Sequence, residues 1–201
     1  FEALYRCAKT RHQHLKNATL TVFSPTTIIG TVCAMKLADH VSKIVLSGGA
    51  TEKLDALAEQ LRTNRRIPIE IEHDTPKAVR QADIILNAYN GPAVLFSVDD
   101  IKPDAIVCDA AIFRHVAEKA RQRKDLAVID CGIVKLPLEQ KLNLHQGIPD
   151  AAVYAHMAET MLLALEDKFV NFSLGNNVNL DKMEDIANMA ARPGFEIVVP
   201  E

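Results

Sequence analysis

The 201-residue chain lacks a positive charge balance, because 26 acidic residues outweigh 23 basic ones and give a formal charge of -3. The charges are spread along the chain, so no basic field exists to hold nucleic acid or an anionic membrane. The sequence also lacks an apolar run long enough to span a bilayer, and no signal peptide opens it. We therefore expect a cytoplasmic protein with no nucleic-acid partner and no integral membrane segment.

Cysteines at C-x-x-C spacing are missing too. The four cysteines lie singly inside apolar runs, at positions Cys7, Cys33, Cys108 and Cys131. Zinc sites and redox disulfides of cytosolic proteins use paired cysteines, so neither is expected. The spacing favours reduced thiols and predicts no metal site.

Glycine is scarce where a nucleotide-binding sheet uses it most. Ala18 to Phe23 run apolar as a buried parallel strand does, a helical pattern follows, and Ile44 to Leu46 are extended again. In such a sheet the turn after the first strand approaches a pyrophosphate, and the next helix offers it free amide donors. Here only Gly30 remains of a G-x-x-G-x-x-G-like pattern, with Ser24 and Thr27 at the earlier glycine positions.

Each residue of this turn has a functional and a structural interpretation. Gly30 either lets a pyrophosphate come close or lets the helix pack tightly on the strand. The hydroxyl groups of Ser24, Thr26 and Thr27 are candidate phosphate ligands, whereas Thr26 or Thr27 can instead cap the helix. Both interpretations stay open at this point.

The end of the second strand offers neither Asp nor Glu to an adenosine ribose. Gly49 stands there instead. Lys53, farther along, is the only residue there that can reach a ribose 2′-phosphate. The alternative interpretation is that the Lys53 side chain is simply solvated. Gly49 and Lys53 complete the candidate contacts at this end of the cofactor.

Strands and helices alternate from residue 18 to residue 149. This alternation predicts an α/β fold with a doubly wound, mainly parallel, Rossmann-like sheet. The expected strands are residues 18–23, 44–46, 67–71, 82–90, 105–111 and 126–133, and the helices between the later strands are residues 51–64, 75–81 and 113–124.

The two ends of the chain depart from this alternation. Residues 1–17 have a helical pattern, and because Phe1 rather than Met comes first, we expect this helix to belong to a preceding N-terminal region. Residues 150–201 predict a helical C-terminal satellite. It contains one long helix over residues 151–170, a shorter helix over residues 181–191 and an extended tail.

Two further places along the expected sheet carry candidate site residues. Tyr89 and Asn90 follow the fourth strand, where such folds line the nicotinamide pocket. Cys131 ends a strand beside Gly132, on the carboxyl edge where open sheets bind ligands. Cys131 is the one cysteine placed to act as a nucleophile, although buried free cysteines are usually inert packing.

The last part of the chain carries specific motifs. Residues 155–195 contain Ala-Glu-x-Met-Leu-Leu, Asn-Phe-Ser-x-Gly, Asp-Lys-Met-Glu and a closing Gly-Phe. In these motifs the chain resembles the C-terminal part of the aldehyde-forming long-chain acyl-carrier-protein (acyl-ACP) reductases. The rest is similar to the NADP-binding domain of that family in order and spacing, including Gln81 to Ile84 and Gly132 to Val134.

The resemblance implies a cofactor, NADP, and a substrate, a fatty acyl thioester on a carrier protein or on CoA. It also implies a two-stage reduction. A cysteine thiolate takes the acyl group as a thioester, and hydride from NADPH then releases an aldehyde.

The chain departs from that family at three positions. Alignment of the Ala-Glu-x-Met-Leu-Leu run places His156 where the family has its catalytic cysteine. The turn keeps only Gly30, and Gly49 stands where the family has an arginine for the 2′-phosphate. His156 and Glu159 lie three apart on one helix and can form a proton-handling pair, although a lone helical histidine is more often structural.

Two functions are predicted from these observations. The first is an NADP(H)-dependent oxidoreductase of the acyl thioester reductase type. In it either Cys131 serves as nucleophile with His156 approaching from the satellite, or His156 replaces the nucleophile and no acyl enzyme forms. The alternative is a non-catalytic Rossmann-like module that binds a nucleotide, an acyl chain or a partner protein.

Overall fold

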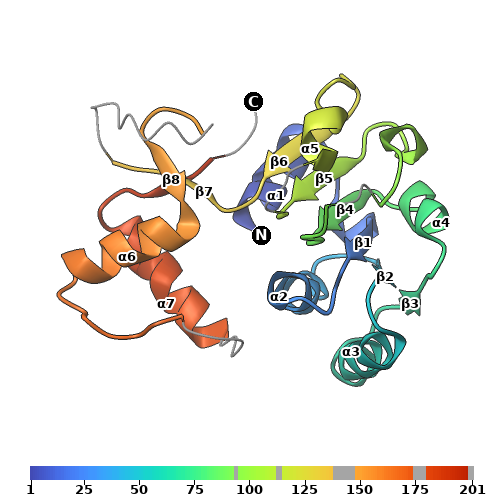
Figure 1. Cartoon of the computed structure of the whole chain (residues 1–201), viewed down its shortest axis with the longest axis horizontal. Coiled ribbons are helices and arrows are strands. Elements are labelled where there is room, and N and C mark those ends of the chain that lie inside the picture. Colours follow the sequence, from blue (N-terminus) through green and yellow to red (C-terminus); the bar gives the residue numbers. More distant parts are fainter. Residues whose placement is uncertain (93–94, 112–114, 138–147, 174–179, 199–201) are drawn as a thin grey trace. The chain divides into compact units, whose positions relative to one another are not determined.

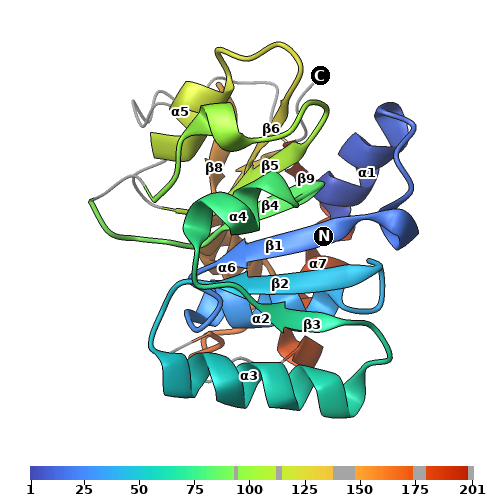
Figure 2. The same cartoon turned by 90° about the vertical axis from the view of Figure 1, so that its right-hand side faces the viewer.

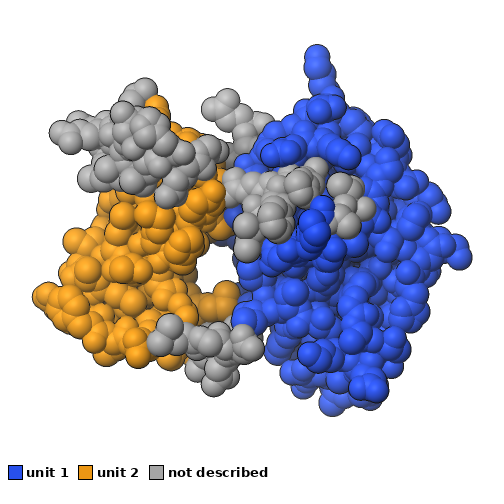
Figure 3. Space-filling model, in the orientation of Figure 1, with its two compact units in different colours: residues 1–131, 199–201 blue, residues 132–198 orange. Residues whose placement is uncertain are grey.

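The computed structural model describes residues 1–92, 95–111, 115–137, 148–173 and 180–198. This part of the chain forms two compact units, residues 1–131 and residues 132–198 (Figure 3), and each is described by itself. The boundary between the units lies after Cys131. The alternation of strands and helices in the sequence predicts a boundary at residue 149 instead. The reason is that the strand after Gly132 pairs with a second-unit strand instead of continuing the large sheet.

The first unit contains a six-stranded sheet in the order β3-β2-β1-β4-β5-β6, and every neighbouring pair in it is parallel (Figures 1 and 2). This confirms the predicted α/β fold with a doubly wound parallel sheet. The strand order reverses between β1 and β4, which is where ligands bind in open sheets of this kind. The strands are β1 (Thr19–Phe23), β2 (Lys43–Ser47), β3 (Ile69–Ile71), β4 (Ile84–Asn87), β5 (Ile106–Asp109) and β6 (Ala127–Asp130).

Helices cover both faces of this sheet. One face packs against α1 (Glu2–Thr10), α2 (Ile28–Leu37) and α3 (Thr51–Asn64). The other packs against α4 (Thr75–Arg80) and α5 (His115–Ala120), with the short 3-10 helix η2 (Val98–Asp100) beside them. A second 3-10 turn, η1 (Leu15–Asn17), leads into β1.

Side chains of β1 point alternately to the two faces of the sheet, so they contribute to the core on both faces. Leu20 and Val22 are fully buried against the α1, α2 and α3 side. Phe23 is buried on the opposite side, where Thr21 also donates its hydroxyl to the Ala78 carbonyl oxygen at 3.0 Å. A parallel strand that is buried on both faces has a nearly continuous apolar sequence. This is why the sequence predicts a strand here.

Helix α1 is shorter than the helix expected over residues 1–17. Its buried residues Leu4, Cys7 and Ala8 belong to the core cluster of the six-stranded sheet. The apolar face of α1 packs against β5 and β6. An upstream partner is therefore not needed to explain that face.

The second unit contains a small antiparallel sheet that the sequence pattern did not predict. Its order is β8-β7-β9, with β7 (Ile133–Lys135), β8 (Ala152–Tyr154) and β9 (Glu196–Ile197). Two helices accompany it, α6 (Ala155–Leu165) and α7 (Leu180–Ala191).

Two sequence predictions are corrected by this sheet. The sixth strand ends at Asp130, because Gly132 adopts a φ of 79° and breaks the extension toward Ile133. The expected helix over residues 151–170 is also wrong at both ends. Its first residues pair with β7, where Val153 faces Val134, and Asp167, with a φ of 50°, follows the end of the helix.

Within the residues that the structure describes, no helix is both long enough and apolar enough to cross a membrane.

Candidate functional site

The turn between β1 and α2 has the left-handed backbone that a glycine normally supplies. Ser24 takes a φ of 53°, a conformation that few residues other than glycine adopt. Its amide donates to the Ser47 carbonyl oxygen at 2.9 Å, which joins the carboxyl ends of β1 and β2. The turn therefore keeps the geometry of the glycine pattern although serine stands in its first position.

Gly30 is required by close backbone packing. A Cβ atom at this position would lie 2.5 Å from the Ser24 carbonyl oxygen and 2.8 Å from the Pro25 Cα. Contacts this short do not occur for real Cβ atoms, so helix α2 can approach the turn only with glycine here. This supports the tight-packing interpretation of Gly30, and it also sets how deep the turn is.

Thr27 is the cap of helix α2. Its hydroxyl accepts a hydrogen bond from the Gly30 amide at 3.1 Å and donates to the Ser24 carbonyl oxygen at 2.9 Å. One of the first amides of α2 is thus satisfied inside the protein. Of the two threonines predicted as capping candidates, the structure assigns the cap to Thr27.

Thr26 instead lies against the end of β2. A Cβ atom built on Gly49 would lie 3.0 Å from the Thr26 hydroxyl oxygen, and one built on Gly48 would lie 3.7 Å from the Ser24 amide nitrogen. The structure thereby brings Ser24, Thr26 and Gly49 together, although they come from two different strand ends. Together with Gly30 they form what we call the first-unit turn site.

Gly49 cannot be exchanged freely for arginine or another residue with a side chain. Its φ is 111°, outside the region that side-chain-bearing residues adopt, and Thr26 occupies the space beside it. Lys53 lies in the first turn of α3, where it is exposed.

Two buried polar residues at the same sheet edge were missed by the sequence analysis. Asn87 ends β4 and Asp109 ends β5, with only 4% and 1% of their surfaces exposed. Asp109 accepts hydrogen bonds from Asn87 Nδ2 at 2.9 Å, the Ala111 amide at 3.1 Å and the Ala117 amide at 2.9 Å. The signal that could have found them is a single polar residue ending each apolar strand.

Asn87 also fixes the segment that follows β4. Its side-chain oxygen accepts from the Tyr89 amide at 3.3 Å, and the Tyr89 ring lies over Gly91. Tyr89 is half-buried and Asn90 is exposed. Both lie beyond the carboxyl end of β4, which borders the reversal of strand order and is shorter than the strand expected over residues 82–90.

Cys131 follows β6 and is half-buried, whereas Cys108 in β5 is buried. A hydrogen bond between their side chains lowers the pKa of Cys131 and raises that of Cys108 well above its usual value. Burial raises the pKa of Cys33 to about 11. Gly132 is exposed, and among the described residues none besides its chain neighbours lies within 4 Å of its would-be Cβ atom.

The predicted proton-handling pair lies in the second unit. His156 and Glu159 line a cavity of about 610 Å³, together with residues 168–173. Glu159 accepts a hydrogen bond from the Ser173 hydroxyl, and the His156 ring stacks on Tyr154 with centroids 5.8 Å apart. We call this cavity the second-unit groove.

Several apolar side chains line the second-unit groove. Phe169 is 83% exposed and Val170 is 62% exposed, an unusual degree for side chains of this size. Leu163 and Phe172 line the same cavity. The groove thus places a histidine and a carboxylate beside an apolar surface.

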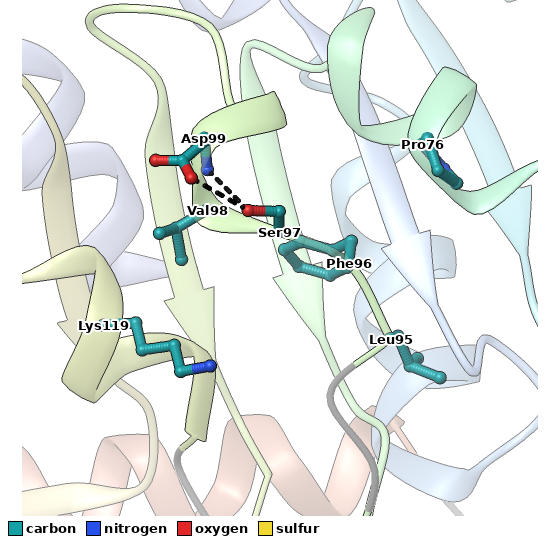
Figure 4. Close-up of a pocket in the computed structure, with 7 residues that line it drawn as sticks. All are labelled: Pro76, Leu95, Phe96, Ser97, Val98, Asp99 and Lys119. Carbon is teal, nitrogen blue, oxygen red and sulfur yellow. Dashed lines mark hydrogen bonds between the residues drawn. The ribbon is translucent and has the colours of Figure 1, made fainter.

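Another cavity, of about 510 Å³, lies on the α4 and α5 face of the first unit (Figure 4). It is lined by residues 95–99 together with Pro76 and Lys119. Asp99 and Ser97 bond to each other there rather than pointing a free group inward. None of the predicted site residues lines it. Among the residues described, no group of three or more His, Cys, Asp or Glu side chains could hold a metal ion.

No family model matches the chain. A curated protein, the aminotransferase PigE of Serratia sp. (strain ATCC 39006), is 27% identical over 174 residues. The match covers 83% of this chain but only 20% of that protein, so the chain spans about a fifth of this relative.

Solved structures share the fold. Shikimate 5-dehydrogenase from Listeria monocytogenes, in complex with shikimate and NAD, has a TM-score of 0.51 at 15% identity, over 63% of this chain and 50% of that one. The ligand-free 5-ketofructose reductase of a Gluconobacter strain has a TM-score of 0.52 at 11% identity, over 94% of this chain and 62% of that one. These likenesses establish a Rossmann-like fold.

Proposed function

We propose that the chain is an NADP(H)-dependent oxidoreductase module of the acyl thioester reductase type. The observation that carries the proposal is the first-unit turn site, where Ser24, Thr26 and Gly49 meet at the carboxyl ends of β1 and β2. This edge is the ligand-binding edge of an open parallel sheet. The fold neighbours named above include a dehydrogenase in complex with NAD, which supports a nicotinamide cofactor.

The residues of the turn fit a dinucleotide. Gly30 lets the backbone of α2 approach the turn to a distance that any Cβ would prevent. The Ser24 and Thr26 hydroxyls would hold the phosphates there. In a glycine-rich turn, backbone amides donate hydrogen bonds to the phosphates. Here the Gly30 amide already donates to Thr27, so the Ser24 and Thr26 hydroxyls would provide part of the hydrogen bonding to the phosphates instead.

Lys53 would serve the ribose end of the cofactor. No acidic residue stands at the end of β2, where NAD-dependent members of this fold hold the ribose 2′-hydroxyl. A lysine in the first turn of α3 instead suits a 2′-phosphate. When bound, NADPH supplies a hydride to a carbonyl carbon.

The second-unit groove would hold the acyl substrate. Its exposed Phe169 and Val170 suit a hydrocarbon chain, and His156 and Glu159, which line the same cavity, would exchange a proton with a reacting carbonyl. The motifs shared with the acyl-ACP reductases converge on this groove, because Glu159 and Ser173 belong to two of them. An approach of His156 to Cys131 stays a prediction.

The similarity to the aminotransferase PigE covers only a fifth of that protein and does not separate the candidate functions.

A non-catalytic module is the second candidate, and His156 is the observation that favours it. An imidazole is not a simple substitute for an acyl-carrying thiolate, and His156 occupies the position where the acyl-ACP reductases have their cysteine. In that case the first unit binds a nucleotide and the second unit binds an acyl chain or a partner protein without turnover.

Two measurements separate the candidates. Calorimetric titration should give binding of NADPH that is tighter than binding of NADH, and Thr26→Val should weaken it without lowering the thermal stability. Absence of binding for either nucleotide at millimolar concentration would remove the oxidoreductase proposal.

Incubation with a long-chain acyl thioester, followed by intact mass spectrometry, tests the chemical step. An acyl adduct in the wild type that is lost in Cys131→Ala identifies the nucleophile. If the wild type forms no adduct but His156→Cys does, the groove binds the substrate and lacks only the thiol. No adduct in either protein favours the binding module.

A further inference from the structure

The connection between β4 and β5 covers its face of the first-unit sheet with little helix. Neighbouring parallel strands are usually joined by a crossover that contains a full helix. Within the described residues of this connection, the only helical element is η2, which has three residues. The cavity of about 510 Å³ lies there, where η2 is flanked by α4 and α5 (Figure 4).

The apolar part of the cavity lining includes an aromatic ring. Phe96 is 5% exposed, and its ring packs against Phe23 of β1 with centroids 4.7 Å apart. Leu95 and Val98 are half-buried, and Pro76 lies in the first turn of α4. A crossover helix would normally cover such side chains. A ligand with a ring or a branched hydrocarbon would bury part of the same surface.

Hydrogen bonds and an ion pair from both neighbouring helices hold η2 in place. Arg80 of α4 pairs with Asp100 of η2, with 2.8 Å between Nη1 and Oδ1. Arg123, which follows α5, donates to the carbonyl oxygens of Val98 at 2.6 Å and Ile101 at 2.7 Å. The wall that η2 forms is therefore held from two sides without a ligand, so little ordering entropy opposes binding.

Lys119 is the cation among the residues that line the cavity. Ser97 and Asp99 are polar too, but the Ser97 hydroxyl bonds both to the Asp99 carboxylate and to its amide, each at 3.2 Å. Lys119 forms no hydrogen bond or ion pair with any residue that the structure describes. Its side chain extends from α5 toward the other lining residues (Figure 4). The cavity thus offers an ammonium group beside an aromatic surface.

We propose that this cavity binds a small molecule that carries an anionic group, such as a carboxylate, on an aromatic or branched apolar body. The anionic group would pair with Lys119 at the α5 side, away from the Asp99 carboxylate on η2, and the apolar body would lie against Phe96. The volume is within the usual range of small-ligand sites. No residue of the first-unit turn site or the second-unit groove lines this cavity, so the proposal does not rest on the proposed function.

The charge of Lys119 sets the selectivity of this site more than its affinity. Lys119 is exposed, and an ion pair at an exposed position strengthens binding by about fivefold at most. Burial of the apolar body supplies the rest and is shared by a neutral analogue. We therefore expect a preference for an anion over its neutral isostere rather than a high affinity.

Amide NMR of the full chain, titrated with 3-phenylpropionate, tests the site. The neutral 3-phenylpropanamide has the same ring and nearly the same size, and it serves as the comparison probe. At pH 7 both probes should shift the amide signals of residues 95–99 and Lys119, and the acid should bind about fivefold more tightly. Added salt should reduce this preference, because exposed ion pairs are screened.

Lys119→Gln should abolish the preference, so that the acid and the amide bind alike. Because Lys119 is exposed, this variant should fold as the wild type does, which a thermal melt checks. Lys119→Arg keeps the charge and should keep the preference. Lys124→Gln is the matched control, because Lys124 is also exposed but does not line the cavity, and it should bind both probes as the wild type does.

Three results overturn the inference. The first is equal binding of the acid and the amide by the wild type, or a preference for the acid that survives Lys119→Gln. The second is a set of shifts confined to the second-unit groove, which would place the probe beside Lys168 instead. The third is the absence of any shift at residues 95–99 at millimolar concentrations of the acid. No nucleotide is present in this titration, so its outcome is separate from that of the NADPH titration, which tests the proposed function.

Discussion

The two candidate regions are built in opposite ways. The first-unit turn site is tightly packed, because Gly30 leaves no room for a Cβ and Gly49 leaves little. The second-unit groove is lined in large part by exposed side chains, among them His156, Phe169 and Val170. A site of the first kind tolerates few substitutions but binds in one geometry. A site of the second kind tolerates many substitutions and adapts to its ligand.

This difference predicts that equivalent substitutions have unequal effects in the two units. Buried groups that satisfy several partners are costly to change, whereas exposed groups lose little. Four predictions test the comparison, in order of decreasing effect on stability.

The largest effect is expected for Asp109→Asn. The carboxylate accepts three hydrogen bonds while almost fully buried, and an amide would turn one donor toward the Ala117 or Ala111 amide. Two donors would then face each other without an acceptor, at a cost of about 3 kcal/mol. Urea denaturation followed by circular dichroism measures the change in unfolding free energy. A loss below that of an ordinary surface substitution would show that the carboxylate does not hold these strand ends together.

Gly30→Ala should destabilise the first unit by about 2 kcal/mol. The added methyl group meets the Ser24 carbonyl oxygen and the Pro25 Cα, both backbone atoms that cannot turn aside. Ile29→Ala is the control, since Ile29 precedes it in α2 and is 45% exposed. Its effect should be much smaller. Equal effects of the two substitutions would mean that the turn can relax around a side chain.

The sequence predicted the first unit far better than the second, and two helices show why. Helix α3 was expected over residues 51–64 and is found there, because its buried residues Leu54, Leu57, Ala58 and Leu61 repeat at helical spacing. Residues 152–154 were assigned to a helix but form β8. Their strand conformation depends on pairing with β7, a contact that no local pattern records.

The candidate site was predictable only in part for the same reason. Position along the sheet was enough to find Ser24, Thr26 and Gly30, since each follows from the strand, turn and helix order. The contact between Thr26 and Gly49 joins two strand ends, and the hydrogen bond from Asn87 to Asp109 joins two strands. Both arise from the register of the sheet, which the amino-acid pattern does not specify.

Thr27→Ala should cost about 1 kcal/mol, the usual value of a helix cap. The substitution removes the acceptor of the Gly30 amide and the donor to the Ser24 carbonyl oxygen. Thr26→Ala is the matched change one residue earlier, where no cap is lost, and its stability should stay near that of the wild type. Thermal denaturation of both variants separates the structural threonine from the candidate phosphate ligand. The reverse order of effects would exchange the two roles.

Glu159→Gln should have the smallest effect, within about 0.5 kcal/mol of the wild type, although it is the same chemical change as Asp109→Asn. Glu159 lies partly in solvent, and its partner Ser173 is exposed and can bond to an amide oxygen as well as to a carboxylate. Denaturation in urea measures this stability. If His156 and Glu159 exchange protons with a substrate, however, the same variant should lower turnover of an acyl thioester while leaving the unfolding free energy unchanged. A stability loss comparable with that of Asp109→Asn would instead mean that the carboxylate is a structural element of the groove, and the contrast between a packed turn and an adaptable groove would fail at this residue.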